Sequence, residues 1–201
     1  MSKNYTLTVK NKSQDYGNVC IYQTTPNQNR NLYSLAWLCK ACPPGASATL
    51  SWGTDYCFCW SYCDRLNPRA VFIIEVQRHA DPEDPDKNAV RFSRERGDNL
   101  FTPATGLLGN LGIYMDKSIV HYEAAVGIVM SAKIAFAAMS TPNYNITFSP
   151  HPDYWVVFGS YQEGELLNFF EYPEGAFHLE YPTNVYDKTI VLHENNTWSE
   201  Q

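Results

Sequence analysis

The sequence predicts an all-β protein, a single domain over residues 1–201 built as an antiparallel β-sandwich of about ten to twelve strands. Apolar and polar residues alternate along most of the chain, which is typical of strands with one buried face. Groups of Gly, Pro, Asn and Asp separate these segments at hairpin spacing. The 201 residues are 44% hydrophobic and contain neither a repeat nor a linker, so we expect one sizeable core.

Two segments in the first third of the chain show the alternation most clearly. In residues 4–10, Tyr5, Leu7 and Val9 fall on one face. In residues 55–60, three aromatic residues share a face opposite two cysteines. Further strands are expected over residues 48–52, 71–76, 89–93, 111–115, 144–148, 154–158, 177–181 and 188–193.

Two other segments do not alternate in this way. Residues 129–139, "VMSAKIAFAAM", fit a strand, but their alanines also suit a helix of two to three turns. Residues 79–88, "HADPEDPDKN", are acidic and broken by two prolines, so we predict a mobile loop there.

Charge and hydropathy limit the partners that the protein can have. The formal net charge of −6 is spread along the chain without a Lys/Arg run, so neither a nucleic-acid partner nor a basic membrane patch is expected. No stretch approaches the ~20 apolar residues of a transmembrane helix. The N-terminus shows no secretory signal peptide, so we expect a cytoplasmic protein, and release by a route that needs no signal stays open.

All six cysteines lie in the first third of the chain, which raises the question of a metal site. Cys39 and Cys42, followed by Cys57, Cys59 and Cys63, supply enough thiolates for zinc or an iron–sulfur cluster. Their spacing is wrong for a zinc ribbon, and cysteines in strands are more often small buried residues. We therefore predict free thiols, no metal site and no cofactor.

Residues 149–153, "SPHPD", form the strongest candidate for acid–base chemistry. The prolines hold the residues before them extended, which places His151 and Asp153 on one side of the chain. A carboxylate in that position could orient the imidazole of a general base or a metal ligand. The alternative is that both prolines simply stiffen a corner between two strands. His178 is expected on a solvent-exposed face beside Glu180.

Aromatic residues supply the candidate ligand-binding surface. The chain has 5 Trp and 14 Tyr, more tyrosine than a core of this size requires. Trp37, Trp60, Tyr154, Trp155 and Tyr161 are the candidates, together with His151 and Asp153. The competing interpretation is that these aromatic side chains fill the core.

Several blocks of the sequence resemble the rhizosphere-induced protein family (RhiA-like proteins). "YTLTVKNKS", "CIYQTTPN", "LSWGTDYCFCW", "NYNITFSPHPDYWVVFGSYQEGELL" and "YPTNVYDKTIVLHENNTWS" occur in the family's order and spacing. The resemblance covers residues 5 to 199 and implies a single all-β domain from soil- or plant-associated microbes, without catalytic residues to transfer. Cysteines stand where relatives have Phe, Ser and Val, which supports buried thiols. This chain has "GIVMSAK" at 127–133, where the family pattern is "GIGMSG". The family pattern favours a strand over a helix there.

These observations favour a non-enzymatic binding or interaction protein that presents an aromatic surface or pocket to a small molecule, glycan or lipid. The alternative is an enzyme of secondary metabolism that uses His151 and Asp153 as an acid–base or metal-ligand pair in an aromatic pocket. A homodimer formed through sheet edges is compatible with either function.

Overall fold

The computed structural model of the chain describes residues 4–24, 32–150, 153–167 and 175–201. Within these ranges the protein is all-β, which confirms the predicted fold class. The described residues form 17 strands and no helix, so the expected ten to twelve strands were too few. None of these residues belongs to a helix that could cross a lipid bilayer.

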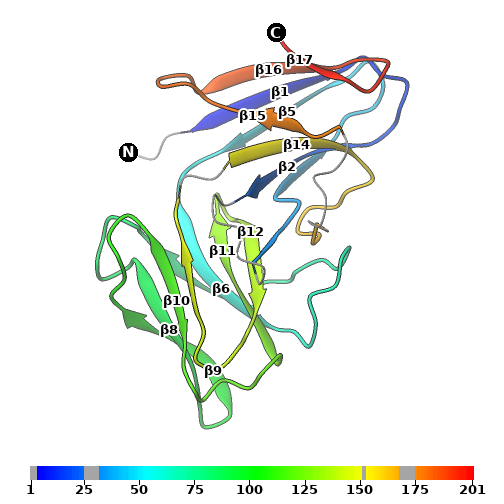
Figure 1. The fold of residues 1–201 in the computed structure, drawn as a ribbon. Coiled ribbons are helices and arrows are strands. Elements are labelled where there is room, and N and C mark those ends of the chain that lie inside the picture. Colours follow the sequence, from blue (N-terminus) through cyan, green and yellow to red (C-terminus); the bar gives the residue numbers. More distant parts are fainter. Residues whose placement is uncertain (1–3, 25–31, 151–152, 168–174) are drawn as a thin grey trace.

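The strands form four sheets, here called sheets I to IV (Figure 1). Sheet I has the order β17 (Trp198–Glu200), β16 (Asp187–Leu192), β1 (Tyr5–Asn11) and β5 (Ser47–Trp52). Sheet II has the order β15 (Phe177–Leu179), β14 (Asp153–Gly159), β2 (Asn18–Thr24) and β4 (Leu38–Ala41).

The other two sheets come from the middle of the chain. Sheet III has the order β3 (Tyr33–Ser34), β12 (Lys133–Met139), β11 (Ala124–Met130), β6 (Tyr56–Tyr62) and β7 (Val76–Ala80). Sheet IV has the order β13 (Asn145–Phe148), β10 (Leu111–Met115), β8 (Ala89–Glu95) and β9 (Asp98–Ala104).

Most neighbouring strands are antiparallel, as the sequence predicts, but two pairs are parallel. β1 pairs with β16, which places both ends of the chain on sheet I, and β8 pairs with β10. Sheets I and II lie in the upper part of Figure 1, and β6 and sheet IV in the lower part. The largest buried cluster joins all four sheets, with Leu7, Ile21, Phe58 and Phe92 as one member from each.

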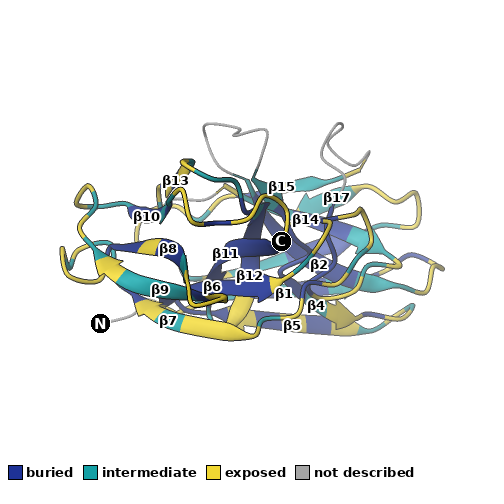
Figure 2. Ribbon diagram, turned by 90° about the horizontal axis from the view of Figure 1, so that it is seen from below, coloured by how far each residue is buried: buried dark blue, intermediate teal, exposed yellow. Residues whose placement is uncertain are grey.

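Sheet III is covered on both faces, which explains the even burial of its central strands. Alternation along β6 sends Phe58 into the large cluster and Cys59 into a second cluster on the opposite face. Figure 2 shows β11 buried along its whole length, and all seven of its residues are buried. A strand buried on both faces loses the alternating pattern, and this is why residues 129–139 also resembled a helix.

Two other expectations need correction. The strand expected over 71–76 is wrong except for its last residue, because residues 72–75 cover the outer face of sheet III, where Phe72 is buried. Residues 79 and 80 belong to β7 and only 81–88 form a connection. Its turns are closed by hydrogen bonds such as that from Asp81 N to Lys87 O, 3.2 Å long.

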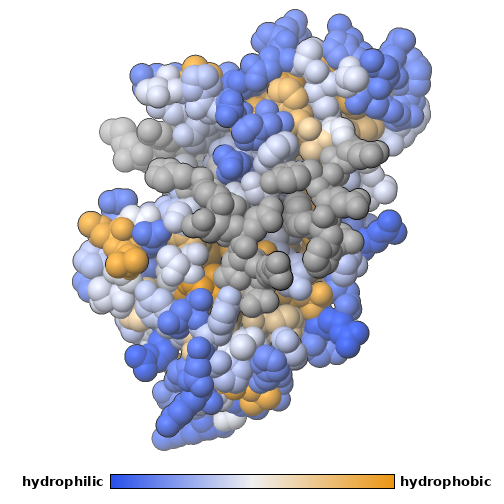
Figure 3. All heavy atoms as spheres, in the orientation of Figure 1, coloured by the Kyte–Doolittle hydropathy of each residue, from blue (hydrophilic) through white to orange (hydrophobic). Residues whose placement is uncertain are grey.

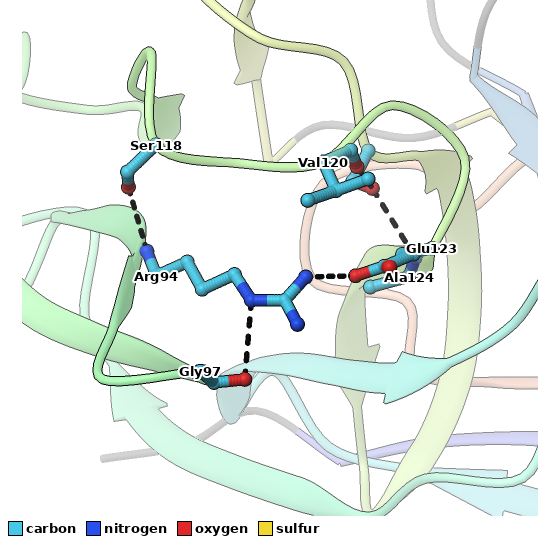
Figure 4. A network of polar contacts seen from close by, with 7 residues as sticks. Arg94, Gly97, Ser118, Val120, Glu123 and Ala124 are labelled. Carbon is cyan, nitrogen blue, oxygen red and sulfur yellow. Dashed lines mark hydrogen bonds and ion pairs between the residues drawn. The ribbon is translucent and has the colours of Figure 1, made fainter.

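Arg94 fixes the connection of residues 116–123 to the end of sheet IV (Figure 4). Its backbone N–H donates to Ser118 Oγ at 2.7 Å, and its Nε donates to Gly97 O at 3.1 Å. The guanidinium also forms an ion pair with Glu123. The positive charge of Arg94 is therefore paired within the fold.

The β11–β12 hairpin turns through Ser131 and Ala132, which have φ angles of 51° and 62°. Positive φ at both positions is the geometry of a type I′ turn, and each residue with a Cβ loses about 1 kcal/mol or more by adopting it. We expect Ala132→Gly to raise the free energy of unfolding by about 1 kcal/mol in urea denaturation. Ser47→Gly, at an exposed strand position, is the control and should lower it. An unchanged or lower stability of Ala132→Gly contradicts this account of the turn.

Candidate functional site

A cleft of about 970 Å³ separates sheets I and II from the end of sheet III. β1, β14 and β15 form one wall. The other wall is formed by residues 54–56 at the start of β6, by the end of β7 and by the segment 81–83. The volume lies within the range of small-molecule sites, which often lie between packed parts of a fold.

Three tyrosines form the wall on the side of sheets I and II. The ring centroid of Tyr5 lies 5.0 Å from that of Tyr181 and 6.4 Å from that of Tyr154. Trp52 supports them, with its ring 5.3 Å from Tyr154. The Tyr181 hydroxyl donates to Thr6 O at 2.9 Å. These contacts fix the rings, so the wall is formed before any ligand arrives.

Tyr56 lines the opposite wall, at the first position of β6. The residue is only 5% exposed, but its hydroxyl is not fully buried and forms no hydrogen bond with any residue that the structure describes. Burial raises the pKa of Tyr56 well above its usual range, and the neighbouring Tyr154, Tyr5 and Asp55 raise it further. The Tyr56 hydroxyl therefore stays protonated and is free to bond to a ligand.

Burial acts on the phenols of Tyr154 and Tyr181 in the same way. It raises the pKa of Tyr154 to about 12, although the Trp52 indole acts in the opposite direction. Burial also raises the pKa of Tyr181, with further contributions from Tyr154 and Asp187. All three phenols are consequently neutral near pH 7 and present electron-rich ring faces.

Carboxylates surround these tyrosines. The members that line the cleft are Asp55, Asp81, Glu83, Asp153 and Glu180. His178 Nε2 lies 3.9 Å from Asp153 Oδ1, and His178 Nδ1 lies 3.7 Å from Glu180 Oε1. His79 is the other histidine, and the described lining contains no lysine, arginine, serine or cysteine.

The described residues of the cleft are too far apart to form a metal centre. Within the described ranges, no three His, Cys, Asp or Glu side chains lie close enough together to hold an ion. The carboxylates are instead distributed over both walls. The cleft can therefore contact a ligand larger than a single ion at several points.

The whole chain can now be compared with known proteins. The model of one family, RhiA, matches residues 2–201. The chain belongs to the RhiA family. It is 29% identical over 198 residues to Protein RhiA of Rhizobium leguminosarum bv. viciae, an alignment that covers 96% of this chain and 84% of that protein. No solved structure matches it significantly.

In this RhiA family member, the cleft contains only part of the site predicted from the sequence. Asp153 and Tyr154 line it, at the start of β14. His151 lies outside the described residues, so its pairing with Asp153 stays a prediction. His178 is exposed beside Glu180, as expected, and approaches Asp153 from the neighbouring strand.

Four of the predicted binding residues lie elsewhere. Trp37 is fully buried behind Tyr154, with stacked rings 6.1 Å apart, and its Nε1 donates to Met130 O at 2.9 Å. Trp60 is buried between sheets III and IV and borders a separate groove of about 310 Å³ between β7 and β9. Trp155 and Tyr161 pack together with a small buried cluster around Cys20 and Tyr22.

The sequence did not identify Tyr5, Tyr56 and Tyr181 as cleft residues. Alternation assigned Tyr5 and Tyr56 to buried faces, which is correct, because both also pack against the core or belong to it. The alternation could not show that β1, β14 and β15 face the ends of β6 and β7 across a cleft, which leaves these tyrosines at its walls. The excess of tyrosine over what a core requires was the signal available.

The cysteines of this RhiA family protein are not all free. Cys20 and Cys39 face each other on antiparallel β2 and β4 and form a disulfide, with their Cα atoms 4.2 Å apart. The expectation of free thiols is wrong for this pair, because direct cross-strand pairing brings residues 19 apart in sequence into contact. Cys42, Cys57, Cys59 and Cys63 are free.

These free thiols differ in reactivity. Burial raises the pKa of Cys42, Cys57 and Cys59 and so lowers the fraction of reactive thiolate, while Cys63 is partly exposed. We expect iodoacetamide to modify Cys63 first in the native protein. In urea without reductant, mass spectrometry should find four modified cysteines, and six after reduction. Six modified cysteines without reductant contradict the disulfide.

Proposed function

We propose that this RhiA family protein is a non-enzymatic binding protein that holds a small polar molecule in the cleft. One observation carries the proposal: a cleft of about 970 Å³ with fixed tyrosine rings on one wall and, on the other, a tyrosine hydroxyl without a partner among the described residues. Aromatic walls with a few polar groups that fix orientation are typical of small-molecule sites.

Among the ligand classes predicted from the sequence, the lining favours polar ones. Five carboxylates line the cleft, and burying them against an acyl chain would be costly. On the face seen in Figure 3, hydrophobic residues of the described surface form small separate groups and no broad apolar area. A lipid is therefore the least favoured of the small-molecule, glycan and lipid classes.

A thermal-shift screen of polar small molecules tests the proposal. Compounds that raise the Tm of the wild type are retested on Glu83→Trp, which places a large side chain on an exposed lining residue. Glu95→Trp, at an exposed position on β8 away from the cleft, is the matched control. Stabilisation should be lost in Glu83→Trp and kept in Glu95→Trp. Equal stabilisation of both variants, or no stabilising compound, would count against a binding cleft.

A second candidate function is acid–base catalysis, because His178 Nε2 lies 3.9 Å from Asp153 Oδ1 at the edge of the cleft. The predicted partner of Asp153 was His151, and His178 could take the same role. NMR spectra of a bound compound after long incubation separate the two functions. A compound that is unchanged supports binding alone. Conversion that stops in His178→Gln while binding persists supports catalysis.

A further inference from the structure

We propose that the ligand of the cleft is an organic cation, a small molecule that bears amine or quaternary ammonium groups. This inference rests on the proposed binding function and assigns the chemical class of the ligand. Two independent features of the cleft carry it, the balance of charge in the lining and the Tyr56 hydroxyl, and the distribution of the carboxylates separates an organic cation from a metal ion.

Among the described residues, no lysine or arginine offsets the negative charge of the lining, and only Asp153 and Glu180 have a histidine, His178, within 4 Å. Five carboxylates line the cleft, against no lysine or arginine among the described residues. Asp55, Asp81 and Glu83 form no ion pair with any residue that the structure describes. The nearby Lys87 is bound to Asp84 instead, with 2.7 Å between Nζ and Oδ2. A cationic ligand would supply the missing counter-charge.

The Tyr56 hydroxyl is the second feature that favours a cationic ligand. The residue is 5% exposed, but its hydroxyl is not among the fully buried polar atoms, so it opens into the cleft near Tyr5, Tyr154 and Asp55, without a partner among the described residues. An ammonium N–H donates to phenol and carboxylate oxygens alike. The ring faces of neutral tyrosines also attract a cation, which is the recurring way in which proteins bind ammonium groups.

The spread of the carboxylates favours an organic cation over a metal ion. Asp153 and Glu180 lie on one wall, while Asp55, Asp81 and Glu83 lie on the other. No described group of three ligating side chains is close enough to coordinate an ion. A molecule with several separated amines can approach both walls at once and also fill a cleft of this size.

Isothermal titration calorimetry at low salt tests the assignment with four probes: spermidine and choline as cations, sorbitol as a neutral molecule and citrate as an anion. The double variant Asp55→Asn/Glu180→Gln neutralises one exposed carboxylate on each wall. Glu95→Gln/Asp98→Asn removes the same charge from the turn between β8 and β9 and is the matched control. Tyr56→Phe removes the hydroxyl alone.

We expect wild-type protein to bind at least one cation and neither other probe. The cleft double variant should weaken that binding by about tenfold or more, and the control by less than about twofold. Tyr56→Phe should weaken it several-fold without lowering the Tm.

Other outcomes overturn the inference in distinguishable ways. Equal weakening by both double variants would show attraction by net charge alone. Binding of sorbitol or citrate in the cleft without binding of cations overturns the ligand class and leaves the binding function intact. If no probe binds and the screen for polar ligands also finds none, both proposals fail.

Discussion

Replacement of Gly127 by alanine is expected to lower the free energy of unfolding by about 3 kcal/mol, at the upper end of the range for overpacked cores. A Cβ at this position would lie 2.3 Å from Phe136 O on the neighbouring β12, and also 3.2 Å from Cys59 Sγ. The carbonyl is backbone, so it cannot move aside without separating β11 from β12. Urea denaturation followed by tryptophan fluorescence measures the change.

Gly97→Ala is the control for Gly127. Gly97 has a φ of 99° and open space around it, so its substitution should cost about 1 kcal/mol from the backbone alone. Similar losses for the two variants would contradict the proposed contact with Phe136 O.

Trp37→Ala is expected to cost about 3–5 kcal/mol, the usual range for a buried aromatic side chain. Trp37 is fully buried, and its removal leaves a cavity behind Tyr154 and removes the hydrogen bond from its Nε1 to Met130 O. Thermal and urea unfolding measure the loss. Trp37→Phe should be milder but still destabilising, because the hydrogen bond from the indole to Met130 O is lost.

The prediction for Trp37 also separates a core residue from a ligand contact. A variant that folds with near wild-type stability and loses a ligand found in the thermal-shift screen contradicts the buried position. Tyr161→Phe is a useful comparison, since Tyr161 is partly exposed and does not line the cleft, so the change should alter stability little.

The sequence predicted those features that depend on local pattern. Alternation correctly separated Phe58 from Cys59 on β6 and placed His178 on an exposed face. The pattern failed where both faces of a strand are buried, as in β11, or where an apolar segment covers a sheet without joining it, as Phe72 does. In those cases hydrophobicity reports burial but not the backbone conformation.

The cleft depends on long-range pairing that local pattern does not contain. Tyr5 and Tyr181 lie at opposite ends of the chain and meet because β1 pairs in parallel with β16. The Cys20–Cys39 disulfide likewise depends on the register between β2 and β4. The sequence could therefore identify Asp153 and Tyr154, but not the partners that complete their wall.

NMR mapping with the best compound from the thermal-shift screen tests the central claim most directly. The claim is that ligands bind in the cleft between the sheets and not at the cluster around Cys20 and Tyr22, against which Trp155 packs. We predict that saturating compound shifts the backbone amide signals of Tyr5, Tyr56, Tyr154 and Tyr181, and leaves those of Tyr22 and Tyr161 unchanged. Shifts confined to Tyr22, Trp155 and Tyr161 would contradict the claim.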